Sequence, residues 1–117
     1  MIANISRLLI VSFLGLSACA TSGQGIKAQK AKKIGDDLVR SLEVYRNEKK
    51  AYPRSIDEFD DYAGIAAAAH SVDVKVFFFS DGHEYYELMI KYFGPGSNLC
   101  VHRSTDEAGI WDCTGAY

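Results

Sequence analysis

The chain of 117 residues contains no hydrophobic run long enough to cross a membrane. Its longest apolar segment, from Leu8 to Leu16, has about half of the roughly 20 residues that a transmembrane helix requires. An excess of basic residues is also missing, because 13 Lys and Arg stand against 15 Asp and Glu. This balance argues against nucleic acid as a main partner. No internal repeat is visible, so we expect a single domain.

Motifs that carry known catalytic chemistry are missing as well. The three histidines form no H-E-x-x-H pair, and no serine lies within a G-x-S-x-G turn. The adjacent acids Asp36-Asp37 and Asp60-Asp61 are of a kind that usually faces solvent. A chain this short also has little room for the cleft of a glycosidase. We therefore expect no enzyme activity, no catalytic residues and no cofactor.

The N-terminal residues have the three parts of a secretory signal. Arg7 and the terminal amine give a positive start, Leu8 to Leu16 is the apolar core, and two small residues follow. The sequence Leu16-Ser17-Ala18-Cys19 resembles the lipobox of bacterial lipoproteins. That resemblance implies removal of residues 1–18 and acylation of Cys19, whose acyl chains would anchor the protein at about 0.8 kcal/mol per buried methylene.

Two interpretations of this segment lead to different locations. Ala18-Cys19-Ala20 also fits an ordinary signal-peptidase site, which would release a soluble periplasmic protein. In lipoproteins the residue after the cysteine directs sorting, and Ala20 is not the aspartate associated with inner-membrane retention. The resemblance therefore implies the outer membrane, facing the periplasm, with surface exposure left open. Without residues 1–18 the chain has 99 residues and a formal charge of −3, since Arg7 is the one charge removed.

Residues 19–25 are expected to form a flexible lipidated tether, and residues 26–117 the domain. From Ile26 to Lys50 apolar residues recur every three or four positions, which predicts an amphipathic helix. The apolar stripe comprises Ala31, Ile34, Leu38, Leu42 and Tyr45. Lysines at 27, 30, 32 and 33 in its first turns either approach anionic lipid head groups or form a solvated face.

Tyr52-Pro53 should end this helix, because proline lacks a backbone donor and restricts the residue before it. Ser55 and Glu58 match a capping box, which predicts a short second helix from Ile56 to Tyr62. Residues 63–71 either prolong that helix or form a connection of small residues, and the pattern favours neither.

From residue 72 onward the pattern is typical of strands. Turn signals at Asp81-Gly82 and in residues 94–98 separate four of them. The expected strands are Val72–Phe79, Glu84–Phe93, Leu99–Arg103 and Ile110–Thr114. One long helix, a short helix and an antiparallel meander predict an α+β fold, with the long helix packed on one face of a four-stranded sheet.

The last two strands can be aligned through the cysteines. If Arg103 pairs with Ile110 at the connecting loop, Cys100 lies directly opposite Cys113 and His102 opposite Trp111. With Cys19 acylated, these two cysteines remain as a pair in an exported chain, which predicts a disulfide. Cys100, His102 and Cys113 could instead supply zinc ligands, but they crowd one edge and export favours oxidation.

A second group of possible metal ligands surrounds the first hairpin and comprises Asp81, His83, Glu84 and Glu87. These residue types are also ordinary turn chemistry, and the spacing that places two histidines on one helix face is missing. We therefore expect no metal site in this chain.

A long amphipathic helix that runs into Tyr45, then Tyr52 to Ile56 and Phe59, resembles the helix-to-loop passage of type IV pilins and pseudopilins. The four-strand tail with a late cysteine pair, ending in residues 111–117, is similar to their globular heads. The likeness covers about residues 26–117. A pilin, however, begins with a prepilin-peptidase site and a long apolar helix, where this chain has a lipobox and a lysine-rich helix. The resemblance implies a pilin-like head held on a membrane by lipid.

The aromatic residues indicate a binding surface. Phe77, Phe78 and Phe79 are consecutive, so they cannot all face one core, and Phe77 and Phe79 would share a face with Tyr85 and Phe93. Either a second layer covers that face or it is exposed and docks a partner. The expected partners are the membrane, through Cys19, and another envelope protein.

These features predict a non-enzymatic binding or assembly component of an envelope machine, such as a pilus, secretion or DNA-uptake system. A periplasmic inhibitor or immunity-type lipoprotein that binds an enzyme is the alternative. An enzyme acting on peptidoglycan is a third and weaker hypothesis.

Overall fold

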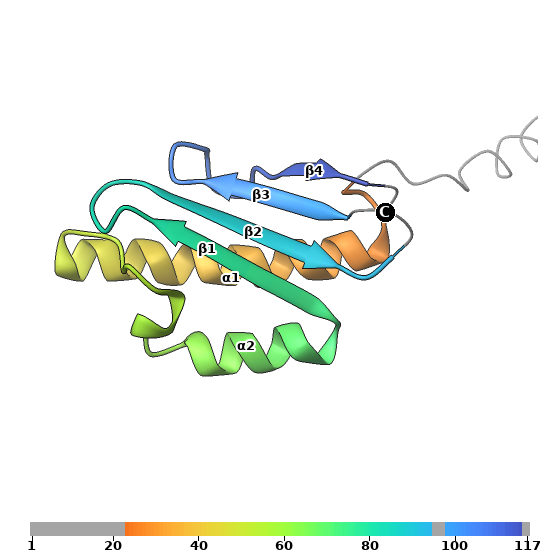
Figure 1. Cartoon of the computed structure of the whole chain (residues 1–117), viewed down its shortest axis with the longest axis horizontal. Coiled ribbons are helices and arrows are strands. Elements are labelled where there is room, and N and C mark those ends of the chain that lie inside the picture. The colour runs from red at the N-terminus through yellow and green to blue at the C-terminus, as the bar shows by residue number, and fades with distance from the viewer. Residues whose placement is uncertain (1–22, 95–97, 116–117) are drawn as a thin grey trace, which may run out of the picture.

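A computed structural model describes residues 23–94 and 98–115 (Figure 1). The signal segment, the lipobox and Cys19 lie outside the described residues, as do most of the expected tether and the Pro95-containing loop. In chain order the elements are α1 (Ile26–Lys49), η2 (Ile56–Glu58), α2 (Tyr62–Ser71), β1 (Val74–Ser80), β2 (Tyr86–Tyr92), β3 (Leu99–Arg103) and β4 (Asp112–Thr114). The expected α+β class, with one long helix and a four-stranded antiparallel sheet, is confirmed.

The strands form one antiparallel sheet in the order β1-β2-β3-β4. Both α-helices lie on the same face of this sheet, with α1 running behind the strands and α2 beside it (Figure 1). Side chains alternate along the strands, and Val74, Leu88 and Ile90 point to the helices and are buried. The sheet therefore has one covered face, called here the inner face, and one open face.

The apolar stripe of α1 packs against the inner face. Ala28, Ala31, Leu38 and Leu42 have no exposed surface, and burying each leucine stabilises the fold by about 1.5–3 kcal/mol. The two alanines have no bulky side chain, so the first turns of the helix can approach the strands closely. Tyr45 completes the stripe but is only partly buried.

The end of α1 is fixed by a cap and by an aromatic contact. Lys50 adopts the left-handed conformation (φ 64°), and its N–H donates to the carbonyl of Arg46 at 2.8 Å. Tyr52 then packs edge-on against Tyr86, with ring centroids 4.8 Å apart, and its hydroxyl donates to Glu43 at 2.9 Å. Burial, and then the Glu43 carboxylate, raise the pKa of Tyr52. This contact returns the chain to the sheet directly after the helix.

The prediction of a helix from Ile56 to Tyr62 is wrong. Only a single 3₁₀ turn, η2, forms there, and Phe59 has extended dihedrals that interrupt it. The Ser55 side chain contacts Asp57 rather than capping a helix, while Glu58 accepts from the N–H of Arg54 at 3.1 Å. The longer helix is α2, which contains all of residues 63–71, because alanine has the highest helix propensity of any residue.

Strand boundaries also differ from the prediction. Val72 and Asp73 belong to the turn after α2, where Asp73 has a positive φ of 55°, so β1 begins at Val74. The final strand is shorter, because Ile110 and Trp111 leave the ladder before Asp112. The predicted pairing of Arg103 with Ile110 is therefore absent from the described ladder, although the register that it implied for the cysteines is correct.

Cys100 lies opposite Cys113 in the β3–β4 ladder, and the two sulfurs are bonded at 2.03 Å. His102, two residues further along β3, is buried, and its ring centroid lies 5.3 Å from that of Trp111. Its Nδ1 donates to the carbonyl of Ile110 at 2.8 Å, because a carbonyl can only accept. The disulfide and this hydrogen bond both hold the C-terminal segment on β3.

Candidate docking surface

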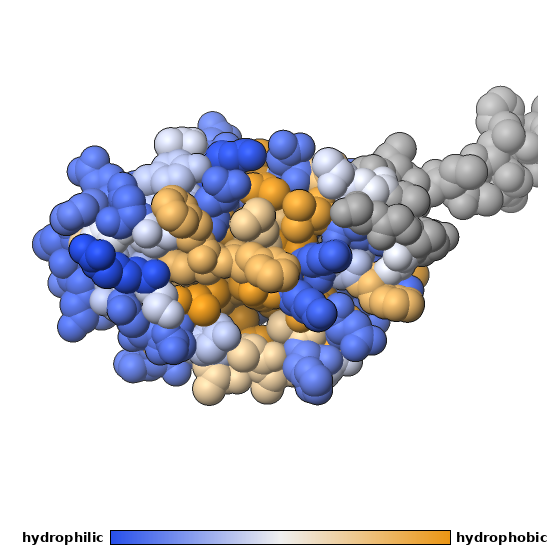
Figure 2. Space-filling model, in the orientation of Figure 1, coloured by the Kyte–Doolittle hydropathy of each residue, from blue (hydrophilic) through white to orange (hydrophobic). Residues whose placement is uncertain are grey.

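The open face of the sheet carries the outward side chains of the strands. They are Lys75, Phe77 and Phe79 on β1, Glu87, Met89 and Lys91 on β2, and Leu99, Val101 and Arg103 on β3. Within the described part of the chain no helix packs on this side (Figure 1). Figure 2, which views this side, shows a hydrophobic band across the strands with hydrophilic residues on either side of it.

An apolar row runs across three strands in the middle of the open face. The register places Phe77 opposite Met89, and Met89 opposite Val101. Phe77 is 48% exposed and Phe79, on the same strand, is 58% exposed. Contiguous apolar surface of this kind marks interaction sites on soluble domains. The row is therefore the strongest candidate for a docking surface.

Charged residues flank the row on both sides, toward the two ends of the strands, and Asp112 lies opposite Val101 where the row reaches β4. At one end Lys75 lies directly opposite Lys91, an arrangement in which like charges repel. At the other end Glu87 lies opposite Arg103 and also accepts a hydrogen bond from the Tyr85 hydroxyl at 3.1 Å. Burial, and then this bond to Glu87, raise the pKa of Tyr85. The open face thus has an apolar centre, two lysines on one side of it, and an acid with an arginine on the other.

The four predicted partner-binding residues do not form one group. Phe77, Phe79 and Tyr85 lie on or beside the open face, as expected from the alternation. Phe93 lies beyond the end of β2, is 72% exposed, and has the ammonium of Lys27 at 5.2 Å from its ring centroid. Met89 and Val101 were not chosen from the sequence, although the β2–β3 register would have placed them beside Phe77.

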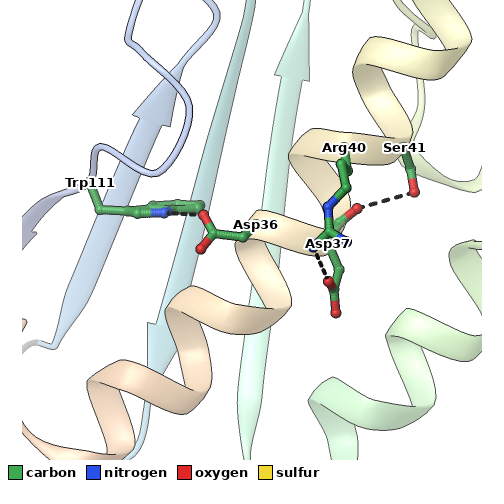
Figure 3. A network of polar contacts seen from close by, with 5 residues as sticks. All are labelled: Asp36, Asp37, Arg40, Ser41 and Trp111. Carbon is green, nitrogen blue, oxygen red and sulfur yellow. Dashed lines mark hydrogen bonds and ion pairs between the residues drawn. The ribbon is translucent and has the colours of Figure 1, made fainter.

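A polar contact joins the C-terminal segment to α1 (Figure 3). The indole Nε1 of Trp111 donates to Oδ1 of Asp36 at 2.8 Å, and the Trp111 ring lies against Gly35. The expectation that both acids of the Asp36-Asp37 pair simply face solvent is therefore wrong for Asp36. Asp37 is bound by Arg40, at 2.7 Å. These contacts hold the C-terminal segment against α1, beside a cleft of about 390 Å³ whose lining includes Asp36, Asp37 and Trp111.

Asp81 stabilises the turn of the first hairpin. Oδ1 of Asp81 accepts from the backbone N–H groups of His83 at 2.8 Å and Tyr85 at 3.2 Å, and these bonds lower the pKa of Asp81. The contribution of these bonds to stability is therefore present above the ordinary aspartate pKa and is lost as the pH falls through the lowered value. Among residues 23–94 and 98–115, no three His, Cys, Asp or Glu side chains gather in a way that could hold a metal.

A cleft of about 510 Å³ lies where β1 begins and β2 ends. Its lining includes Lys75, Lys91 and Phe93, together with His70 and Asp73 at the end of α2. The two lysines belong to the open face, so this cleft adjoins the side of the apolar row that Lys75 and Lys91 flank. Its walls are more apolar than polar, as is usual for ligand-binding surfaces.

Comparisons of the chain with protein-family models, with curated protein sequences and with solved structures find no match. Among the described helices, none combines the length and the hydrophobicity that crossing a membrane would require.

Proposed function

We propose that this chain is a non-enzymatic binding protein of the bacterial envelope, anchored to the outer membrane through acylated Cys19, whose open sheet face docks another envelope protein. The observation that carries the proposal is the apolar row of Phe77, Met89 and Val101 with Phe79 beside it. Two phenylalanines exposed on one face of one strand are hard to explain by folding alone, since the alternating side chains already fill the core.

The architecture is compatible with a pilin-like head. A long helix packed across an antiparallel meander, with a disulfide near the C-terminus, is the arrangement that the resemblance implied. An accessory role in a pilus, secretion or DNA-uptake machine follows from that resemblance. The alternative, an inhibitor that binds a single soluble enzyme, would use the same face, so the captured partner distinguishes the two.

Substituting both exposed phenylalanines of β1 with threonine is expected to abolish partner capture. Threonine retains a high strand propensity, so Phe77→Thr with Phe79→Thr should keep the fold. Truncating a hot-spot aromatic typically weakens binding by 2 kcal/mol or more, which is about 30-fold. The measurement is in-cell crosslinking of the tagged protein followed by mass spectrometry of the captured proteins.

The matched control is Val44→Thr with Ile110→Thr, which alters two exposed apolar residues away from the row. Capture of pilus or secretion components that is lost only with the β1 variant would support the accessory role. Capture of one soluble enzyme would support the inhibitor instead. Equal capture by the wild type and the β1 variant would rule out the open face as the docking surface.

The lipid anchor has a separate test. If Cys19 is acylated, Cys19→Ala should transfer the protein from the membrane fraction to the soluble periplasm, because the acyl chains supply most of the membrane affinity. The measurement is fractionation of cells that express the wild type or the variant. A variant that stays fully in the outer-membrane fraction would contradict anchoring through this cysteine.

A further inference from the structure

The fold collects most of its lysines at one end. The segments that meet there are residues 26–33 of α1, residues 70–76 at the start of β1, and residues 90–94 at the end of β2 (Figure 1). Together they contain six lysines, at positions 27, 30, 32, 33, 75 and 91, and a single acid, Asp73. We call this region the basic end. Its charge contrasts with the formal −2 of the whole chain.

Two contacts establish that these segments adjoin one another. Lys75 lies opposite Lys91 in the β1–β2 ladder. The ammonium of Lys27, one residue into α1, lies 5.2 Å from the centroid of the Phe93 ring, just past β2. Lys27 of α1 and the two lysines of the sheet therefore belong to one surface, although up to 64 residues of sequence separate them. Lys32 and Lys33 line a separate cleft with Asp36 and Asp37.

The same end holds the two most exposed large hydrophobic residues of the described chain. Ile26 is 77% exposed and Phe93 is 72% exposed, more than either phenylalanine of the open face. Lys27 follows Ile26 in the chain and contacts the Phe93 ring, and Phe93 shares a cleft with Lys75 and Lys91. Apolar tips surrounded by basic side chains are typical of surfaces that rest on a membrane, where the tips enter the head-group region and the lysines meet lipid phosphates.

We propose that the basic end binds the surface of an anionic lipid bilayer. Ile26 and Phe93 enter the head-group layer, and Lys27, Lys75 and Lys91 contact lipid phosphates. The cleft beside Phe93, lined by Lys75 and Lys91 and also by the acid Asp73, would receive a head group, with the two lysines outnumbering the one carboxylate. The lysine pair of the ladder also favours this occupant, because an anion between two opposed cations removes their repulsion.

The closeness in sequence of the basic end to Cys19 favours a membrane over an acidic protein as its binding partner. The described residues begin at Gly23, only four positions after Cys19, and the basic end includes the start of α1 immediately after it. An acyl group on Cys19 would therefore hold this end, rather than the opposite one, near the lipid. The inference goes beyond the proposed docking function, and the head-group contacts do not themselves require the acyl group.

Charge reversal at two lysines of the basic end is the first test. Lys27→Glu with Lys91→Glu should preserve the fold, because an acid near a helix N-terminus is favourable and a carboxylate at position 91 would attract Lys75. Each lysine near an anionic surface contributes about fivefold to partitioning, so the loss of two lysines alone should weaken binding about 30-fold. The two added carboxylates are repelled by the surface and should weaken it further. The probe is a vesicle of phosphatidylcholine with about a third phosphatidylglycerol.

The soluble chain of residues 20–117 is used for this test, because every helix, every strand and the disulfide that the structure describes lie between Ile26 and Thr114. Its unfolding transition is recorded for each variant. The matched control, Lys49→Glu with Lys50→Asp, makes the same change of charge at the opposite end of α1, where aspartate tolerates the left-handed conformation of Lys50. Binding should be weaker on pure phosphatidylcholine and should fall with salt.

Two outcomes would overturn the proposal: absence of wild-type binding to anionic vesicles, or an equal loss in the Lys27/Lys91 variant and the control. A second measurement uses the full chain in cells. A photoreactive p-benzoylphenylalanine in place of Phe93 should crosslink to phospholipid, whereas the same group in place of Val44 should not. Adducts at position 93 to protein alone would exclude the membrane as the occupant. Neither result depends on Phe77 or Phe79, so the docking proposal is tested separately.

Discussion

Reduction of the Cys100–Cys113 disulfide is expected to lower the free energy of unfolding by about 3 kcal/mol, the value that chain entropy gives for a loop of this length. The bridge spans 13 positions and holds a strand of only three residues, Asp112–Thr114, on the edge of the sheet. In a chain of this size the loss corresponds to a midpoint lower by about 15 °C, at about 4–8 °C per kcal/mol. Thermal unfolding with and without a reductant measures it.

Intact mass provides the control for this experiment, because reduction must add two hydrogens to the chain of residues 20–117. Replacement of both cysteines by alanine should reproduce the effect of the reductant, with a further loss because Cys100 is fully buried. An unchanged midpoint in a sample whose mass shows complete reduction would contradict the prediction. It would mean that Trp111 and His102 hold the C-terminal segment without the bridge.

Alanine at Gly35 is expected to destabilise the protein by about 2 kcal/mol, although alanine ordinarily strengthens a helix by about 1 kcal/mol over glycine. A methyl group there would overlap the Cη2 and Cζ2 atoms of Trp111. The ring cannot move away freely, because its Nε1 is bonded to Asp36 and its other side lies near His102. Overpacking of about 1–3 kcal/mol and a weakened bond to a charged group of about 1.5–3 kcal/mol exceed the gain in propensity.

The structure offers a matched control for this substitution in the other helix. Gly64 lies inside α2, is exposed, and an added methyl group there would meet nothing within 4 Å. Gly64→Ala should therefore stabilise the protein by about 0.5–1 kcal/mol, the propensity gain alone. Urea unfolding of both variants gives the comparison. Stabilisation by alanine at both positions would show that Trp111 does not pack against α1.

Periodic patterns predicted the parts of the fold that depend on local sequence. The stripe from Ala31 to Leu42 indicated which side of α1 meets the sheet, because a helix repeats every 3.6 residues. Alternation in β1 and β2 separated Val74 and Leu88 from Phe77 in the same way. The position of Cys100 opposite Cys113 followed from counting antiparallel partners, which requires only that the two strands pair.

Other features depend on contacts that no local pattern indicates. The bond between Trp111 and Asp36 joins residues 75 positions apart, and neither has a neighbour that signals the other. At Ser55 the capping-box pattern was present, yet the helix formed later, where α2 also packs against α1 and β1 and buries Ala69. In α2, helix propensity and tertiary packing both favour a helix, although the capping-box motif predicted one earlier in the chain.

The candidate surfaces, too, were predicted in part from local patterns and in part depend on tertiary contacts. Three consecutive phenylalanines predicted that both faces of β1 are apolar, and the exposure of Phe77 and Phe79 agrees with a face left open. The helices cover the face that carries no charge, while Lys75, Glu87 and Lys91 lie on the open face with these phenylalanines. The meeting of Lys27 with Phe93 likewise needs α1 to begin where β2 ends.

The chain has a single tryptophan, and its location makes it a label-free reporter. Trp111 lies against Gly35 with its indole bonded to a carboxylate, so its fluorescence will change when the C-terminal segment leaves α1. Circular dichroism follows the helices and the sheet as a whole. Recording both signals during unfolding separates release of β4 from loss of the core, and a binding partner that perturbs the emission must touch or displace this segment.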